Sequence, residues 1–146
     1  LLLNNTSYSM SGFKHVSPIK GDNPIDLNKY VDDNECQEIF CDQIINYVPI
    51  DSLHTYIKNL VEKLAHKGLL TITSIDLIEL SRLYSQGVFD TLTYNRILFG
   101  TKQHPWDFKQ SVVHLDEVNS ILLSLGLKIL TKKIIGHTFV IQGERA

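Results

Sequence analysis

The sequence has little that would mark a partner or a compartment. Its 146 residues carry a net charge of −2 with scattered basic residues, so no basic patch points to nucleic acid or to a membrane surface. The apolar runs are only a few residues long, far below a membrane span, and no signal-peptide pattern is visible. We therefore expect one domain, residues 1–146, with a core of its own.

Cysteine is scarce: Cys36 and Cys41 are the only two. Their odd spacing on a short extended segment would put the thiols on opposite sides, which predicts no disulfide, a reducing compartment and a cytoplasmic location. Neither the cysteines nor the histidines show metal-ligand spacing, so we expect no metal site. A Gly-x-Ser-x-Gly elbow, a phosphate-binding Gly-Lys-Ser/Thr loop and a Cys-His signature are absent as well, and no catalytic residue stands out.

Glycine is missing from the opening stretch "LLLNNTSYSMSG" until Gly12. The three leucines predict the start of a buried strand. In many cofactor-binding sheets the loop after the first strand is glycine-rich, because the backbone must approach the ligand closely. Here Asn4, Asn5 and Thr6 occupy that place with side chains.

The middle of the chain has the clearest periodicity. Between Asp51 and Lys67 the apolar residues form one helical stripe, with Asp51 as the expected N-cap and Gly68 as the expected left-handed stop. The runs Cys36–Cys41 and Leu69–Ser74 on either side are apolar and typical of strands. Strand, helix and strand in this order predict a crossover unit, hence a parallel pair in an α/β sheet.

Further elements follow in the second half. Asp76 begins a helix with Glu79 as capping-box partner, and Thr91–Phe99 is a second, short helix. A loop with Pro105 comes next, and Asp116 is the expected cap of a third helix. The tail reads as an antiparallel hairpin around Gly136.

The stretches "AHKGLLTITS" and "SLGLKILTKKIIGHTFVIQG" resemble class I S-adenosylmethionine (SAM)-dependent methyltransferases, in the order and spacing of elements over residues 36–142. The first is similar to the helix-end turn and following strand of that family, the second to its closing hairpin. The resemblance implies a Rossmann-like methyltransferase sheet of roughly seven strands, mostly parallel, with a C-terminal antiparallel hairpin. It also implies SAM as the possible cofactor.

The N-terminal part departs from the family pattern. Aligned with it, Asn4 and Thr6 stand at glycine positions, Ser17 stands where an acid would hold the ribose, and Asn23–Tyr30 would be the third strand. The connections are too short for ordinary crossovers, so the N-terminal crossover helices should be reduced or missing. Without the acid, charge-assisted hydrogen bonds worth roughly 1.5–3 kcal/mol are lost, and we expect weak or absent SAM binding.

Several residues are candidates for the site. By the resemblance, Asp26 would lie near the adenine, and Asp42 and Gln43 would line the cofactor or substrate cleft at the carboxyl edge of the sheet. The alternative for Asp42 is that it caps the following turn. His104 and Trp106 fall where the family places substrate-binding elements, although a loop tryptophan also often packs over a helix end. The cofactor-binding candidates are Asn4, Thr6, Asp26, Asp42 and Gln43, and the substrate-binding candidates are His104 and Trp106.

Two functions are open at this point. The chain is either a small SAM-dependent methyltransferase with an atypical cofactor loop, or a catalytically inactive relative that acts in protein–protein binding or assembly. Because the short connections leave one sheet face without helices, we expect a homodimer or a stable complex with another protein, through that face or residues 76–99. The alternative is a monomer whose 76–99 segment folds back over its own sheet.

Overall fold

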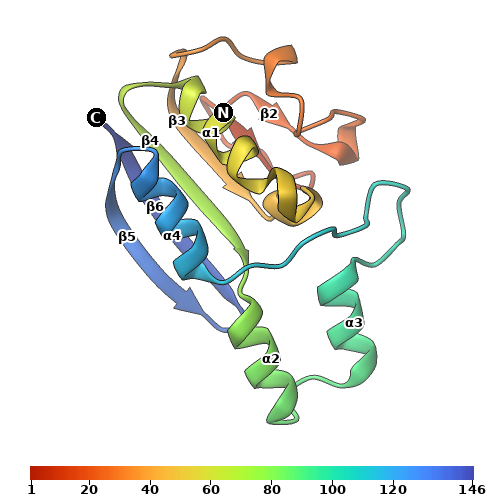
Figure 1. The fold of residues 1–146 in the computed structure, drawn as a ribbon. Coiled ribbons are helices and arrows are strands. Elements are labelled where there is room, and N and C mark those ends of the chain that lie inside the picture. Colours follow the sequence, from red (N-terminus) through yellow and green to blue (C-terminus); the bar gives the residue numbers. More distant parts are fainter.

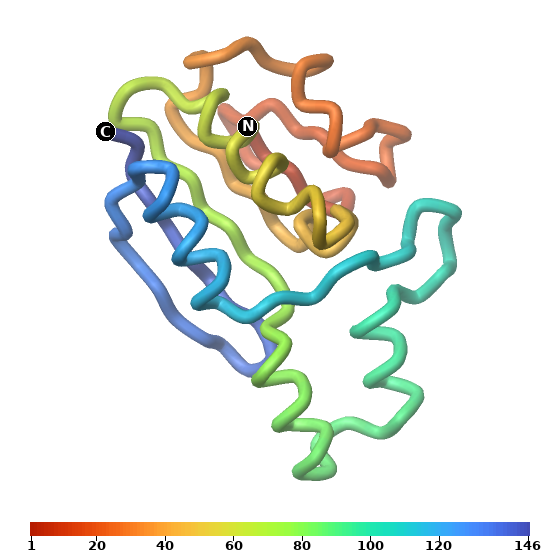
Figure 2. The backbone as a smooth tube through the Cα atoms, in the orientation of Figure 1, coloured from red at the N-terminus to blue at the C-terminus, as the bar shows by residue number.

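The computed structural model describes residues 1–146 and contains one six-stranded sheet with four α-helices. The strand order is β2-β1-β3-β4-β6-β5, parallel from β2 to β4 and antiparallel between β4, β6 and β5. In Figure 1, α1 and α4 lie side by side on one face of the sheet, and α2 and α3 extend away from its edge; Figure 2 traces the same path. The strands are β1 (Leu2–Leu3), β2 (His15–Val16), β3 (Cys36–Asp42), β4 (Leu64–Ile75), β5 (Leu127–Ile135) and β6 (Thr138–Arg145), and the helices are α1 (Leu53–Lys63), α2 (Leu77–Ser85), α3 (Thr91–Phe99) and α4 (Leu115–Ser124).

The predicted crossover unit is confirmed. β3 and β4 are neighbouring parallel strands, and α1 connects them. The stripe of α1 is buried against the sheet, which explains why these residues form a helix here. The C-terminal hairpin around Gly136 is also confirmed, as is the absence of an α-helix between β1 and β2 and between β2 and β3.

The predicted boundaries of the first helix are wrong at both ends. Asp51 lies in a 3-10 turn before α1, and the helix ends at Lys63, because Leu64 already pairs with Cys36 in the sheet. The left-handed residue is Lys67, with a φ of 61°, and not Gly68. Gly68 instead allows close packing, since a β-carbon there would lie 2.9 Å from the Ala65 carbonyl oxygen.

The third strand expected over Asn23–Tyr30 is absent, and the sheet has six strands instead of roughly seven. This segment satisfies its backbone locally: Asp26 N donates to Asn23 O at 3.2 Å, and Tyr30 N donates to Leu27 O at 3.0 Å. Pro24 has no N–H to give to a ladder, which also disfavours a strand.

Most of the apolar core lies on one side of the sheet. Alternate residues of the central strands, such as Ile39, Ile72 and Ile141, join α1 and α4 in one hydrophobic cluster. Because side chains alternate along a strand, the other face carries the residues between them. There Phe40, Thr71 and Gln142 are neighbours across β3, β4 and β6, and Gln142 Nε2 donates to Thr71 Oγ1 at 2.9 Å. This face thus carries polar side chains beside a smaller apolar group that includes Leu2 and Phe40.

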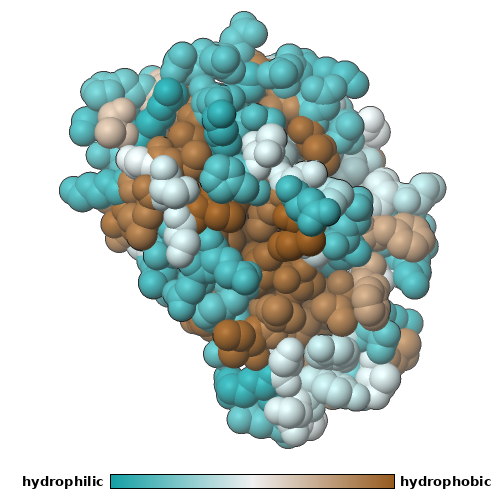
Figure 3. All heavy atoms as spheres, viewed as in Figure 1, coloured by the Kyte–Doolittle hydropathy of each residue, from teal (hydrophilic) through white to brown (hydrophobic).

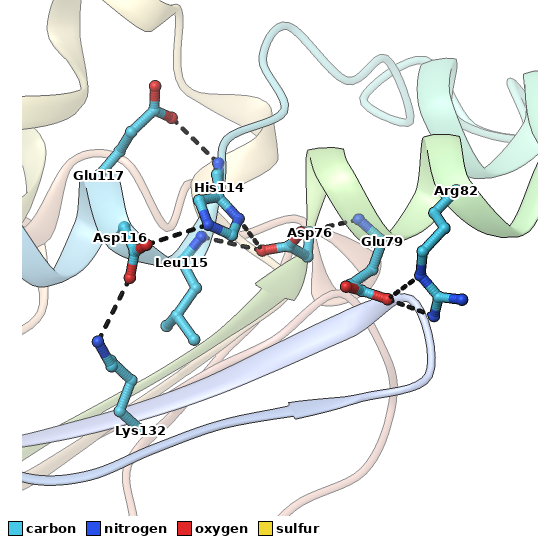
Figure 4. Close-up of polar contacts among 8 residues, drawn as sticks. All are labelled: Asp76, Glu79, Arg82, His114, Leu115, Asp116, Glu117 and Lys132. Atoms are coloured by element: carbon cyan, nitrogen blue, oxygen red, sulfur yellow. Dashed lines mark hydrogen bonds and ion pairs between the residues drawn. The ribbon is translucent and has the colours of Figure 1, made fainter.

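A single buried carboxylate joins the end of β4 to two helices. Asp76 is fully buried, and its Oδ1 accepts from Glu79 N at 3.0 Å, which caps α2 as predicted. The predicted capping box is not completed, because the Glu79 carboxylate pairs with Arg82 and Asp76 N donates to the His137 carbonyl oxygen. Its Oδ2 accepts from Leu115 N at 2.9 Å and lies 2.8 Å from His114 Nδ1 (Figure 4). The beginnings of α2 and α4 are therefore fixed to one point.

The N-cap of α4 is His114, and the prediction of Asp116 as its cap is wrong by two residues. Both ring nitrogens of His114 face carboxylates, since Nε2 lies 3.3 Å from Asp116 Oδ2. Burial alone would lower the pKa of His114, but the bond and charge of Asp76 and the charge of Asp116 outweigh it and raise the pKa above its usual value of 6.5.

Two neighbouring substitutions test the one-sided core. We expect Ile72→Ala to lower the free energy of unfolding by about 2–5 kcal/mol, because it opens a cavity between β4 and the helices. Thr71→Ala, one residue away on the other face, should cost only about 0.5–1.5 kcal/mol for one hydrogen bond. Urea denaturation measures both, and equal losses would contradict a core on one side only.

The His114 cluster makes stability depend on pH. Because its folded-state pKa is raised, the contribution of His114 is fully present below the unfolded pKa near 6.5 and is lost as the pH rises through the folded value. We expect wild type to exceed His114→Asn in free energy of unfolding most at low pH and progressively less at alkaline pH. Urea denaturation across this range measures the difference, in which titrating groups that do not contact His114 cancel. A difference that grows with pH would contradict the assignment.

Candidate functional site

The carboxyl ends of β1, β2, β3 and β4 meet at one edge of the sheet, the edge at which open α/β sheets bind ligands. The residues that follow these ends are Asn4, Ser17, Gln43 and Asp76. The candidate cofactor residues Asn4 and Thr6 lie here, next to the end of β2.

The loop after β1 is held by the side chain of Asn4. This residue is buried, and its Oδ1 lies 2.8 Å from His15 Nε2 and accepts from Thr6 N at 3.4 Å. Its Nδ2 donates to the Tyr8 carbonyl oxygen at 2.9 Å. The Asn4 side-chain amide therefore makes its hydrogen bonds within the chain, whereas a glycine-rich loop would present backbone N–H groups to a ligand.

Ser17 ties the same loop to the end of β2. Its hydroxyl is buried and donates to the Thr6 carbonyl oxygen at 3.1 Å, and its backbone N–H donates to Asp22 Oδ2 at 3.1 Å. No acidic side chain follows Val16 directly. Ser17 stands where the family resemblance implies a ribose-binding acid, and its hydroxyl is hydrogen-bonded to the loop after β1.

Tyr47 connects this loop with a distant part of the chain. Its hydroxyl donates to Asp107 Oδ1 at 2.9 Å and accepts from Asn5 Nδ2 at 3.2 Å. Burial raises the pKa of Tyr47 to about 12, so the hydroxyl stays a donor at neutral pH. Burial would raise the pKa of Asp107, but hydrogen bonds from Thr101 and Tyr47 lower it overall, which keeps the carboxylate ionised.

Residues 100–112, called the strap below, run across this edge and are firmly attached. The fully buried Asn46 accepts from Gln110 N at its backbone oxygen (2.7 Å), and its Nδ2 donates to the Ser111 carbonyl oxygen (3.1 Å). At the other end Gly100 has a φ of 92°, and a β-carbon there would lie 2.3 Å from the Asp107 carbonyl oxygen. Only glycine fits this close approach.

A pocket of about 370 Å³ lies between the strap and the segment after β2. Trp106 forms part of its wall and meets the Tyr47 ring edge-on, with centroids 5.9 Å apart. His104 is not part of the wall; its ring stacks on Trp106 at 5.1 Å. The pocket is lined by Pro18, Asp22, Asn23, Pro24, Ile25, Tyr47, Pro105, Trp106, Phe108 and Gln110.

Three candidate residues lie outside this pocket. Asp42 faces the side of the sheet opposite α1, where its carboxylate accepts from Thr73 Oγ1. Gln43 has a φ of 58° and donates its N–H to the Thr73 carbonyl oxygen at 3.0 Å. Asp26 pairs with Lys29 at 3.2 Å. Their roles as cofactor ligands remain predictions.

Sequence reasoning did not select Asp22 as part of this edge, and it did not pair Tyr47 with Asp107. The partners Tyr47 and Asp107 are 60 positions apart, and nothing in the sequence marks them as a pair. No group of three or more His, Cys, Asp or Glu side chains is placed to hold a metal ion. None of the helices has the length and apolar character needed to cross a membrane.

Comparisons with known proteins give structural neighbours only, since neither a protein-family model nor a curated protein matches the chain. A SAM-dependent methyltransferase from Archaeoglobus fulgidus aligns with a TM-score of 0.59 and 13% identity, over 99% of this chain and 75% of that one. An O-methyltransferase family protein from Burkholderia thailandensis aligns with a TM-score of 0.58 and 12% identity, over 91% of this chain and 36% of that one.

A third neighbour is the 1,6-didemethyltoxoflavin-N1-methyltransferase of Burkholderia thailandensis, solved with 1,6-didemethyltoxoflavin and S-adenosylhomocysteine, at a TM-score of 0.54 and 9% identity. The alignment covers 82% of this chain and 48% of that protein. The chain therefore spans less than half the length of both Burkholderia proteins. At such identities the likeness concerns the fold alone. The chain has the Rossmann-like fold of class I SAM-dependent methyltransferases.

Proposed function

We propose that this chain is a methyltransferase-fold binding subunit that does not hold SAM in the way the family resemblance implies. The observation that carries the proposal is the closed loop after β1, in which Asn4, Thr6 and Ser17 bond to one another and to their neighbours. A shared fold does not fix a shared activity, which depends on the residues at the site.

The energetics of this loop oppose the cofactor. To admit a ligand along the backbone, the loop would have to give up bonds of the buried Asn4 and Ser17, and each buried group left unpaired costs about 1–3 kcal/mol. No acid at the end of β2 compensates through the ribose hydroxyls, a contact worth roughly 1.5–3 kcal/mol.

Isothermal titration with SAM and S-adenosylhomocysteine tests the proposal. We expect no saturable binding tighter than a Kd of about 1 mM for either compound, because the loop offers neither free backbone nor an acid. A Kd in the range of about 1–10 µM for either compound would contradict it. In that case Asp26, Asp42 and Gln43 are the first residues to mutate.

A binding role requires a contact surface. The best one is formed by residues 77–99, which contain α2 and α3 and are called the α2–α3 extension below. Of its two helices, α2 buries only Leu80 and α3 buries no residue at all. Isolated helices of this length are marginal in water. Within the extension the Tyr84 and Tyr94 rings contact each other, with centroids 4.4 Å apart.

The extension also concentrates exposed apolar side chains, and Figure 3 shows apolar surface over the region of α2 and α3. A patch of this kind on a monomer indicates a protein contact. We propose that a second protein chain covers this patch, and the first partner to test is a second copy of this chain. The exposed large apolar residues here are Leu77, Ile78, Tyr84, Val88, Leu92 and Phe99.

Sedimentation equilibrium of matched variants tests self-association. We expect a dimer at micromolar concentration, and we expect Leu92→Asp, at a position on α3 that is 59% exposed, to shift it to monomer. Leu123→Asp on α4 changes a side chain of similar exposure (53%) outside the extension and should leave the dimer intact. A wild-type monomer, or an equal effect of both variants, would contradict self-association through α3.

The second candidate is a small SAM-dependent methyltransferase. It is supported by the pocket beside the strap and by the neighbour solved with both S-adenosylhomocysteine and a methyl acceptor. The titration described above separates the two candidates, since this one requires that SAM binds.

A further inference from the structure

The pocket beside the strap has a wall chemistry that selects a ligand class. We propose that it binds a small aromatic compound of one or two rings that carries no negative charge, with an aromatic amine as the best fit. This proposal is independent of whether SAM binds, because none of the loop residues Asn4, Asn5 and Thr6 lines the pocket.

The wall formed by residues 18–25 is fixed before any ligand arrives. Tyr56, fully within the core, donates its hydroxyl to the Pro24 carbonyl oxygen at 2.9 Å. Asn23 N donates to the Tyr30 hydroxyl at 2.8 Å. Pro18 and Pro24 have restricted backbone φ angles. Little conformational entropy remains to be lost on binding, which favours affinity.

The opposite wall is fixed by the strap. Asp107, next to Trp106, is held by Tyr47 and Thr101, and Gln110 donates its backbone N–H to Asn46 at 2.7 Å. The two walls thus belong to segments that are far apart in sequence, and Tyr47 lies between them.

The lining favours an aromatic ring. Tyr47, Trp106 and Phe108 contribute three aromatic side chains, and Ile25 and three prolines add further apolar surface. Phe108 is 53% exposed and Ile25 is 37% exposed, so large apolar groups face solvent at a concave site. Aromatic pairs gain energy beyond area burial. The volume of about 370 Å³ is at the lower end of small-molecule pockets, which limits the ligand to one or two rings.

The charges of the lining disfavour anions. Asp22 is the only charged residue among the ten, and no Lys, Arg or His lines the pocket. Asp22 Oδ2 accepts from Ser17 N and lies 3.5 Å from Lys20 Nζ, which is outside the lining, whereas Oδ1 has no hydrogen-bond partner in the chain. A carboxylate oxygen without a donor suits an amine, and no cationic side chain lines the pocket to pair with a phosphate or carboxylate; Lys102 Nζ, also outside the lining, lies 5.7 Å from the Phe108 ring centroid.

A series of three probes with the same ring tests the proposal: indole (neutral), tryptamine (cationic) and indole-3-acetate (anionic). Trp106 is the only tryptophan, so its indole N–H gives a single resonance in a ¹⁵N-correlated NMR spectrum. We expect this resonance to shift saturably with indole at a Kd of about 1 mM or tighter. Tryptamine should bind about three- to fivefold tighter than indole, and indole-3-acetate should bind more weakly.

Three variants separate pocket binding from other causes. Phe108→Ala should weaken all binding about tenfold, while Leu130→Ala, on the far edge strand β5, should change nothing. Asp22→Asn keeps an acceptor for Ser17 N and should abolish the preference for tryptamine over indole while indole binding persists. Dispersed amide spectra of each variant confirm folding.

Two outcomes would overturn the proposal. One is a Trp106 resonance that does not move with indole or tryptamine, and the other is an anion that binds as tightly as the amine. Failure here leaves the SAM titration unaffected, so the two results are distinguishable.

Discussion

The short N-terminal connections are the constraint on which the rest of the structure depends. Only residues 4–14 join β1 to β2, and no α-helix lies between β2 and β3. Parallel sheets are normally covered by crossover helices on both faces. Here α1 and α4 cover one face, and the other carries the polar Thr71, Thr73 and Gln142 beside the apolar Leu2 and Phe40. The polar residues of that face reduce the apolar area that the missing helices would have to cover.

The same constraint shapes the ligand-binding edge. Without a crossover helix after β1, no helix N-terminus faces the edge at this point, and the loop bonds to itself through Asn4 and to β2 through Ser17. On the other side of the edge the strap is pinned to Asn46 and Tyr47. The Tyr47 hydroxyl then joins the loop and the strap, so segments that would surround a cofactor are bonded to each other.

Local patterns predicted much of the fold. The stripe of α1, the Asp76 cap and the hairpin at Gly136 each depend on residues close in sequence, and each was found as expected. The errors come from competition with tertiary contacts. The first helix was predicted four residues too long because Leu64 pairs with Cys36, and Asn23–Tyr30 was predicted as a strand although its backbone is satisfied by local turns.

The site was less predictable because its decisive contacts join distant segments. Asn4 and Ser17 were recognised as departures from a cofactor loop, but the bond from Ser17 to Thr6 could not be read from spacing. A site built for a cofactor leaves polar groups for the ligand to satisfy. At this edge every buried side-chain nitrogen and oxygen has a partner within the chain. The oxygen without one, Asp22 Oδ1, belongs to the partly exposed wall of the adjacent pocket, so ligand-binding potential lies beside the closed loop and not inside it.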